Sequence, residues 1–319
     1  TVLAATAVIN GQITLGAMLA IQYIVGQLNS PVEQLMNFIY SLQDVKISLE
    51  RINEIHQSRN EESKNNQMKE FAGEKAIRIN EISFRYDPHS LKKTLDNITF
   101  EIPEGKVTAI VGASGSGKTT LIKLMLGYYP VSEGAIMVSG KNINEYNLKW
   151  WRRCCGVVMQ DGVIFSESIA RNIAVGDSEV DIARLEQAAR IACIHDYILS
   201  LPLKYNTKIG RDGVGLSQGQ KQRILIARAV YKNPVFIFLD EATNSLDAKN
   251  EREIVENLDD FYKGRTVVVV AHRLSTVKNA DQIVVIDSGK VVEKGTHTEL
   301  IEKQGGYFNL VKNQLELGN

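Results

Sequence analysis

The sequence predicts an α/β fold with a mostly parallel β-sheet, a small antiparallel sheet, a helical region and an N-terminal helical segment. Residues 235–239 (VFIFL) and 266–271 (TVVVVA) are almost entirely apolar, which is typical of strands buried on both faces of a parallel sheet. A third apolar run, 107–111, enters a glycine-rich loop that opens a helix, and the spacing between 181 and 231 is helical.

The first 56 residues are predicted to be helical. Residues 1–9 are apolar, Asn10-Gly11-Gln12 interrupts them, and 13–28 is again mostly apolar, somewhat short of the ~20 residues that a spanning helix needs. Beyond Pro31, apolar residues recur every three or four positions, as in a long amphipathic helix. Both a soluble dimerisation helix and the end of a bundle of membrane helices fit this pattern. The nearly uncharged first half favours the membrane interpretation.

Two domain boundaries follow from composition. Residues 57–74 are polar with little periodicity, which predicts a linker. From Lys75 onward, alternating segments at 76–79, 82–86 and 98–102 predict a small antiparallel sheet, and 283–292 predicts a hairpin. We therefore expect an N-terminal segment over 1–56, a linker over 57–74 and one domain over 75–319.

Composition excludes some classes of function. Lysine plus arginine and aspartate plus glutamate both number 37 in the 319 residues, so there is no electrostatic case for nucleic acid as the main partner. The three cysteines lack metal-ligand spacing and favour a reducing compartment. The chain starts within apolar sequence, without a methionine or a basic leader. We therefore expect it to be a fragment of a longer protein, with no visible signal peptide.

The strongest motif is residues 112–119 (GASGSGKT), which match the phosphate-binding pattern G-x-x-x-x-G-K-[ST] at every fixed position. Glycines let successive backbone N–H groups point inward to hold a polyphosphate, and the helix that follows attracts anions through its N-terminus. Lys118 adds a positive charge for the β- and γ-phosphates, and Thr119 can place its hydroxyl on the bridging Mg²⁺. The loop predicts a nucleotide polyphosphate with Mg²⁺ as ligands.

Other polar residues follow the strands of the predicted sheet. Asp240 and Glu241 end one strand and His272 ends another, so all three belong at the edge where the phosphate-binding loop also lies. Asp240 could hold Mg²⁺ or cap a helix, and Glu241 could accept a proton from water or lie on the surface. A lone histidine such as His272 is often only a core residue, but its place at a strand end favours function.

Residues 216–220 (LSQGQ) resemble the signature of ATP-binding-cassette (ABC) ATPases. The resemblance extends from about Lys75 to the C-terminus, with every family motif in family order. It identifies the core as a P-loop NTPase fold with a helical subdomain, and residues 1–56 as similar to the end of an exporter membrane domain. Residues 207–210 resemble the loop before the signature in exporters, and 245–247 resemble the loop that crosses the dimer.

The motif and the resemblance together assign the site. The expected catalytic residues are Lys118, Gln160, Glu241 and His272. The expected nucleotide contacts are Tyr86, Gly112, Ser114, Gly115, Ser116, Gly117, Lys118, Thr119, Thr120, Ser217, Gly219, Gln220 and Asp247. The expected Mg²⁺ ligands are Thr119, Gln160 and Asp240. Ser217 is expected to cap the helix that runs to Tyr231. The resemblance implies that Tyr86 stacks on adenine and that Ser217 faces ATP bound to a second cassette.

The resemblance further implies an ATPase subunit of a membrane exporter, in which ATP closes a pair of cassettes and hydrolysis releases them. The pair is expected to be a homodimer or a dimer of half-transporters, in the cell membrane of a bacterium, with the cassettes in the cytoplasm. Residues 155–174 and Gln218 look closest to peptide and protein exporters, including the bacteriocin and haemolysin types. A lipid or drug exporter, a soluble ABC ATPase and a degenerate regulatory cassette stay open as alternatives.

Overall fold

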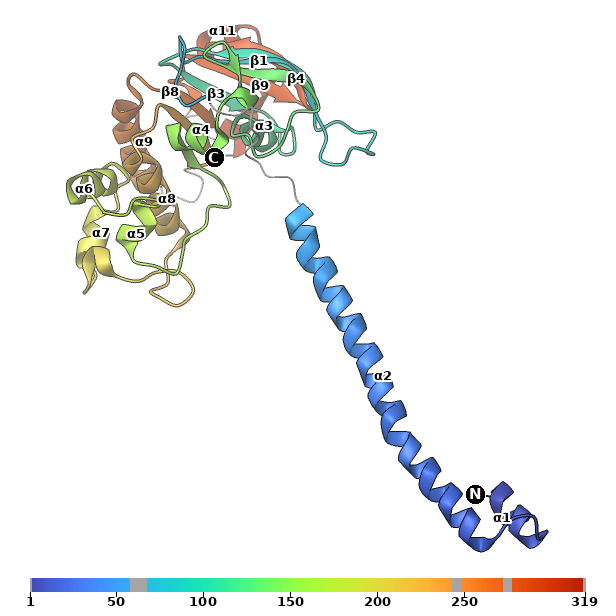
Figure 1. Ribbon diagram of the computed structural model, residues 1–319. Coiled ribbons are helices and arrows are strands. Elements are labelled where there is room, and N and C mark those ends of the chain that lie inside the picture. Colours follow the sequence, from blue (N-terminus) through green and yellow to red (C-terminus); the bar gives the residue numbers. More distant parts are fainter. Residues whose placement is uncertain (1, 58–67, 243–247, 272–276, 318–319) are drawn as a thin grey trace. The chain divides into compact units, whose positions relative to one another are not determined.

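The computed structural model describes residues 2–57, 68–242, 248–271 and 277–317 and divides the chain into two compact units, Thr1–Glu61 and Glu62–Asn319 (Figure 1). The first unit contains helix α1 (Val2–Ile9) and helix α2 (Leu15–Gln57). The predicted break at Asn10-Gly11 is a turn in which Gly11 has a positive φ of 73°. Helix α2 runs on through Pro31 and includes the amphipathic stretch that was predicted beyond it.

Helix α2 presents apolar side chains to its surroundings along most of its length. None of its residues is buried, and the exposed ones include Leu28, Leu35, Leu42 and Leu49. Among the described residues, no helix combines the length and the sustained hydropathy that crossing a bilayer requires.

The larger sheet of the second unit has the strand order β10-β9-β3-β8-β7-β6. Its parallel part is formed by β6 (Cys155–Val158), β7 (Phe236–Asp240), β8 (Thr266–Val270), β3 (Val107–Val111) and β9 (Gln282–Asp287), and β10 (Lys290–Gly295) adds an antiparallel edge. Alternate residues of β8 contribute to two separate apolar cores, Val267 and Val269 to one, Val268 and Val270 to the other. Burial on both faces explains why such strands read as unbroken apolar runs.

The smaller sheet is antiparallel, with the order β2-β1-β4-β5. Strands β1 (Ile77–Phe84) and β2 (Leu95–Ile102) match the predicted segments before the phosphate-binding loop. Strands β4 (Glu133–Val138) and β5 (Lys141–Asn142) come after the loop and complete the sheet. The sequence pattern did not indicate them, nor β6. Their place depends on pairing with distant chain, Ile136 opposite Ile79 for example.

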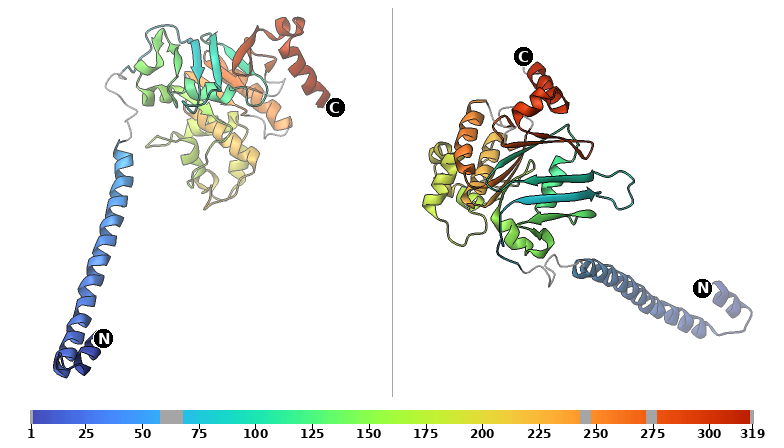
Figure 2. Two further views of the ribbon diagram at one scale, coloured as in Figure 1. Left: turned by 90° about the vertical axis from the view of Figure 1, so that its right-hand side faces the viewer. Right: turned by 90° about the horizontal axis from the view of Figure 1, so that it is seen from above.

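Helices cover the sheets and form the region between 169 and 231. Helix α3 (Lys118–Met125) follows the phosphate-binding loop, and 3₁₀ turn η1 (Ile143–Glu145) precedes α4 (Leu148–Cys154). Helices α5 (Ile169–Ile173), α6 (Ile182–Ile191) and α7 (His195–Ser200), 3₁₀ turn η2 (Lys204–Asn206) and helix α8 (Gln218–Tyr231) follow. Helices α5, α6 and α7 gather at the end of the unit far from β1 and β4 (Figures 1 and 2). The chain continues through α9 (Ala248–Tyr262), α11 (His297–Glu302) and α12 (Gly306–Leu317).

The part of the expected linker that the structure describes, from Met68 onward, packs on the second unit. The Phe71 ring lies 4.8 Å from the Trp150 ring and 5.5 Å from the Phe236 ring, measured between centroids. Met68 forms a bridge with Tyr146. These contacts place Met68 and Phe71 in the packing of the second unit, although their polar neighbours in the sequence read as linker.

Strand register brings the predicted site residues to one edge. Ile110 of β3 pairs with Val270 of β8, and Val270 pairs with Asp240 of β7. The carboxyl ends of three neighbouring parallel strands therefore lie side by side. In parallel sheets, this carboxyl edge is where ligands bind.

Candidate nucleotide-binding site

The loop between β3 and α3 has a backbone that only glycine can follow at two positions. A Cβ on Gly112 would lie 2.0 Å from the carbonyl oxygen of Ile286. Gly117 has a φ of 105°, and a Cβ there would lie 2.5 Å from Cδ2 of Leu95. The loop is thus packed tightly against β9 and β2 and opens directly into the N-terminus of α3, which favours anions.

The Lys118 side chain folds back over this loop. Its ammonium donates hydrogen bonds of 2.9 Å to the carbonyls of both Gly112 and Ala113, and the residue is buried. Burial lowers the pKa of Lys118, while the nearby Glu241 and Asp240 carboxylates act in the opposite direction. A buried cation whose two hydrogen bonds here go to neutral carbonyls would gain from an anionic phosphate oxygen.

Asp240 is fully buried at the end of β7. Neither of its carboxylate oxygens has a hydrogen-bond partner among the described residues. Burial raises the pKa of Asp240. The Thr119 hydroxyl is close enough to oppose that shift, although its geometry falls short of a hydrogen bond. A buried carboxylate without a partner is costly unless it meets a cation. The carboxylate beside Thr119 therefore fits a divalent metal ion.

This arrangement matches the way Mg²⁺ is usually bound in nucleotide sites. The described residues contain no cluster of three or more His, Cys, Asp or Glu side chains that could hold a metal alone. Mg²⁺ needs no such cluster, because it is commonly held by one or two protein oxygens together with substrate phosphates and water. The donor set on this edge therefore fits Mg²⁺ bound together with a polyphosphate.

Glu241 has an unusual backbone that is held from two sides. Its φ is 52°, in the left-handed region that residues other than glycine rarely adopt. Its N–H donates to the carbonyl of Val270 over 3.0 Å, and its carbonyl accepts from Nε2 of Gln222 over 2.9 Å. Strand β8 and helix α8 thus fix the direction in which this half-buried carboxylate leaves the strand.

A pocket of about 530 Å³ brings several predicted residues together. Lys118, Thr119, Gln160 and Glu241 line it, with Thr120 and the loop glycines Gly115 and Gly117. Gln160 follows strand β6 and is exposed. Lysine, hydroxyl, amide and carboxylate groups from three separate segments therefore face one space next to the buried Asp240.

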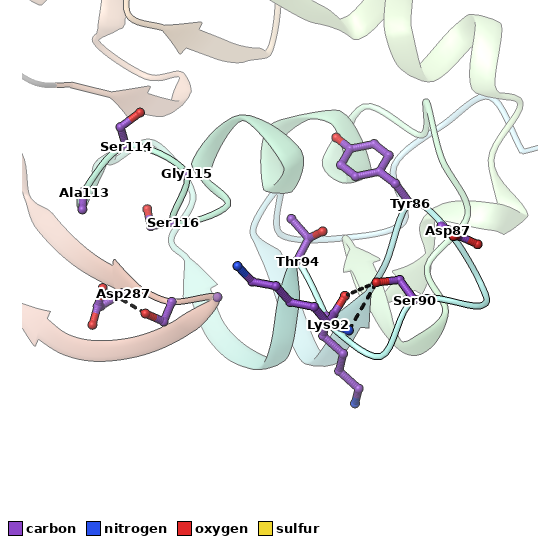
Figure 3. Close-up of a pocket in the computed structure, with 13 residues that line it drawn as sticks. Tyr86, Asp87, Ser90, Lys92, Thr94, Ala113, Ser114, Gly115, Ser116 and Asp287 are labelled. Atoms are coloured by element: carbon purple, nitrogen blue, oxygen red, sulfur yellow. Dashed lines mark hydrogen bonds between the residues drawn. The ribbon is translucent and has the colours of Figure 1, made fainter.

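A second pocket of about 600 Å³ adjoins the first, because Thr94, Ser114 and Gly115 line both (Figure 3). Tyr86 and the loop residue Ser116 belong to it. The Tyr86 ring is 49% exposed and meets Phe84 edge-on, with 5.0 Å between ring centroids. Its hydroxyl lies 3.2 Å from the Thr120 hydroxyl. Contacts with Phe84 and with the Thr120 hydroxyl therefore hold the orientation of the Tyr86 ring, and its exposed surface stays accessible to a ligand.

Ser217, Gly219 and Gln220 line neither pocket. Ser217 caps helix α8, since its hydroxyl accepts from the Gln220 N–H over 3.2 Å and its own N–H donates to Oε1 of Gln220 over 2.9 Å. Ser217 is exposed. The structure confirms the expected cap but does not bring these three residues to the pockets of their own chain.

Comparison with known proteins identifies the second unit. The family model described as "ABC transporter" matches residues 95–244, which include the phosphate-binding loop, Asp240 and Glu241. The chain contains an ABC transporter ATP-binding domain. Members of this family bind ATP and hydrolyse it to power transport.

Two curated relatives share the same level of similarity. The chain is 40% identical over 316 residues to leukotoxin translocation ATP-binding proteins (LktB) of Mannheimia haemolytica and of Bibersteinia trehalosi. The match covers 99% of this chain and 44% of each relative. A solved structure of a bacterial Atm1-family ABC exporter with ATP bound is 31% identical, with a TM-score of 0.81 over 95% of this chain and 53% of that one. The chain thus spans about half the length of its relatives.

Several residues that line the nucleotide-binding site were not predicted from the sequence. Thr94, the lysine pair Lys92 and Lys93 and the turn Ser288-Gly289 line the larger pocket, but no motif indicated them. The N–H of Gly289 donates to the Ser116 carbonyl, which brings the β9–β10 turn to the phosphate-binding loop. The turn was recognisable as a hairpin. Its place in the site follows only from the pairing of β9 with β3.

Two predicted residues of the ABC site, Asp247 and His272, lie outside the described residues, as do Ser245 and Leu246. Their roles stay predictions. Thr207 and Gly210, from the segment that resembles the loop before the signature, are described. Thr207 is buried after η2, and a Cβ on Gly210 would lie 2.9 Å from the carbonyl of Phe165.

Proposed function

We propose that this chain is the ATP-hydrolysing part of a membrane exporter of proteins or peptides. The observation that carries the proposal is the 40% identity to a leukotoxin translocation protein over 99% of the chain. The pocket that Lys118, Thr119, Gln160 and Glu241 share beside Asp240 supports hydrolysis in particular. These intact side chains argue against a degenerate cassette that only binds nucleotide.

In the proposed reaction, each group of the site has a separate task. The amides of the glycine-rich loop and Lys118 hold the β- and γ-phosphates, and Tyr86 packs on the adenine. Thr119, Asp240 and Gln160 would hold Mg²⁺, which when bound neutralises charge on the phosphates. Glu241 accepts a proton from water as the water oxygen bonds to the γ-phosphorus. The bond from that phosphorus to the bridging oxygen breaks, and ADP leaves with the electron pair.

The stacking role of Tyr86 gives the first testable prediction. Replacing Tyr86 by alanine should weaken ATP binding by about 1–3 kcal/mol, the usual contribution of an aromatic ring stacked on a base. Tyr86→Trp should keep the affinity, because a larger ring preserves the stack. The measurement is a titration of nucleotide by equilibrium fluorescence. Equal dissociation constants for the wild type and both variants would show that no stack exists.

Active-site sharing between two cassettes is the second part of the proposal. Ser217 is exposed at the N-terminus of α8 and, like Gly219 and Gln220, lines neither of the two pockets described above. A helix N-terminus with a capping serine offers hydrogen-bond donors to an anion. We infer that these residues, with Asp247, contact ATP held by a second copy or a related half-transporter.

A mixing experiment tests this arrangement. Lys118→Ala and Ser217→Ala chains should each be inactive alone. Mixed, they should regain one competent site in each heterodimer, which combines the intact loop of one chain with the intact signature of the other. ATPase activity is measured at a fixed total concentration across mixing ratios. Activity that never exceeds the sum of the two single variants would count against sharing.

The proposed location is the bacterial cell membrane, with the ATP-binding domain in the cytoplasm. The exposed apolar side chains along α2 support membrane attachment over a soluble ABC ATPase. The transported substrate would be chosen outside the ATP-binding domain, whose two described pockets are proposed to hold ATP. The 40% identity to leukotoxin translocation proteins favours a protein or peptide substrate over a lipid or drug.

A reconstitution experiment tests the class of substrate. In lipid vesicles, the full-length protein should show ATPase activity that changes on adding a candidate leader-bearing peptide, and the vesicles should accumulate the peptide only with ATP. Lipids and small hydrophobic drugs serve as the comparison set. ATPase activity that responds to lipids or drugs and never to peptide would instead indicate a lipid or drug exporter.

A further inference from the structure

Residues 159–168, here called the Gln160 loop, connect strand β6 to helix α5. The loop begins in the phosphate pocket, which Gln160 lines, and ends at Ser168, whose hydroxyl caps α5 by accepting from the Arg171 N–H over 3.2 Å. Between these ends, the loop contains no regular secondary structure. Its course therefore depends on side chains that bind its backbone.

Asn172 is the first such side chain. It is fully buried in α5, and its amide oxygen accepts from the Phe165 N–H over 2.8 Å. Its amide nitrogen contacts the carbonyls of Phe165, Glu167 and Ser168 at 3.0, 3.3 and 3.1 Å. One buried amide thus contacts backbone groups of three residues in the second half of the loop, Phe165, Glu167 and Ser168.

Arg228 joins this arrangement to helix α8. Its Nη1 donates to the Val163 carbonyl over 2.9 Å, its Nε to the Asn172 carbonyl over 2.7 Å, and its Nη2 to the Asn172 side-chain oxygen over 3.2 Å. The guanidinium also lies 5.3 Å from the Phe165 ring centre. Burial lowers the pKa of Arg228 to about 10, so the group is still a cation at neutral pH. Its planar fork suits several carbonyls at once.

The first half of the loop packs on the same helix. A Cβ on Gly162 would lie 2.2 Å from Cδ1 of Leu225, which is one turn before Arg228 in α8. The loop backbone therefore lies in close contact with α8 at Gly162 and is hydrogen-bonded to it at Val163. Helix α8 is the helix that Ser217 caps at its other end.

We propose that Arg228 and Asn172 are positioning residues that hold the Gln160 loop on helix α8 and thereby set the place of the Gln160 amide in the phosphate pocket. The inference deepens the proposed function, because it rests on Gln160 acting at the Mg²⁺-bound nucleotide. A loosened loop would leave Lys118 and Tyr86 in place, so ATP binding would persist. Gln160 would meet the metal less often, and both turnover and the Mg²⁺ requirement would change.

Replacing Arg228 by glutamine tests the proposal in the chain described here. Because small misplacements of catalytic groups cost up to about 10²-fold, we expect kcat to fall by about 10- to 100-fold. The Mg²⁺ concentration for half-maximal activity should rise, while the ATP dissociation constant measured in EDTA stays unchanged. Arg228→Lys, which keeps the charge and can reach one carbonyl, should recover part of the loss.

The matched control is Arg223→Gln, on the same helix. Arg223 also donates to a backbone carbonyl, that of Cys193 over 3.1 Å, but on a segment away from the Gln160 loop. Its loss should leave the Mg²⁺ requirement unchanged even if stability falls. Asn172→Asp should reproduce the effect of Arg228→Gln, and the double variant should be no worse than the more severe single one, as expected for residues that act through one contact.

The possible results separate a failure of the proposed function from a failure of the positioning role. A wild-type chain without ATPase activity would contradict the proposed function itself. An active wild type whose Mg²⁺ requirement is the same in Arg228→Gln, or shifts equally in Arg223→Gln, would overturn the positioning role alone. If thermal unfolding shows that Arg228→Gln does not fold, Arg228→Lys is the deciding variant. A raised Mg²⁺ requirement in Arg228→Lys supports the positioning role, and an unchanged requirement overturns it.

Discussion

The Glu241→Gln variant is expected to bind ATP as the wild type does and to hydrolyse it about 10²–10⁴-fold more slowly, the usual contribution of a general base. Glutamine keeps the size of the side chain and can follow the same backbone, whose N–H and carbonyl are held by Val270 and Gln222. The variant loses only the ability to take the proton of the attacking water. The ATP-bound pair of cassettes should therefore accumulate.

Turnover is measured by phosphate release, and the ATP-bound dimer by size-exclusion chromatography with and without nucleotide. Glu302→Gln, an exposed carboxylate of helix α11, controls for the change of net charge. Wild-type turnover in Glu241→Gln would remove Glu241 from the role of base. Slow turnover without an accumulated dimer would leave that role intact but contradict the proposed pairing of cassettes.

The second large effect is expected for Lys118→Ala, which should lower ATP turnover by about 10²–10³-fold, the usual cost of removing one preorganised stabilising group. Alanine removes the cation that faces the phosphates. It also leaves the carbonyls of Gly112 and Ala113 without the ammonium that now bridges them. We therefore expect weaker ATP binding as well as slower hydrolysis.

Lys123→Ala is the matched control, because Lys123 lies on the same helix α3 but lines neither pocket. Its turnover should stay close to that of the wild type. Calorimetric titration with ATP measures the binding part of the effect, and phosphate release measures the chemical part. Unchanged binding and turnover in Lys118→Ala would refute the assignment of the loop as the phosphate site.

Several features were accessible from the sequence because they depend on contiguous residues. The phosphate-binding loop is one, since strand, glycines, Lys118 and helix follow one another within 20 residues. The Ser217 cap is another, because Gln220 three positions later completes it. The strands at 235–239 and 266–271 were recognisable because burial on both faces leaves no polar position in their interiors.

Other features were decided only by the tertiary structure, because they depend on pairings between distant segments. The order β3-β8-β7 brings Asp240 and Glu241 beside the phosphate-binding loop. Pairing of β9 with β3 carries Gly289 to Ser116. No local pattern contains the choice of neighbouring strand, which depends on the packing of whole faces.

The same contrast applies to single side chains. The sequence alone predicted a nucleotide site at Gly112, Lys118 and Thr119, since the motif contains its own geometry. The role of Arg228 was decided by the tertiary structure, because one arginine in an amphipathic helix is ordinarily a solvated residue. Folding leaves Arg228 half-buried and places the carbonyls of Val163 and Asn172 within hydrogen-bond distance of its guanidinium.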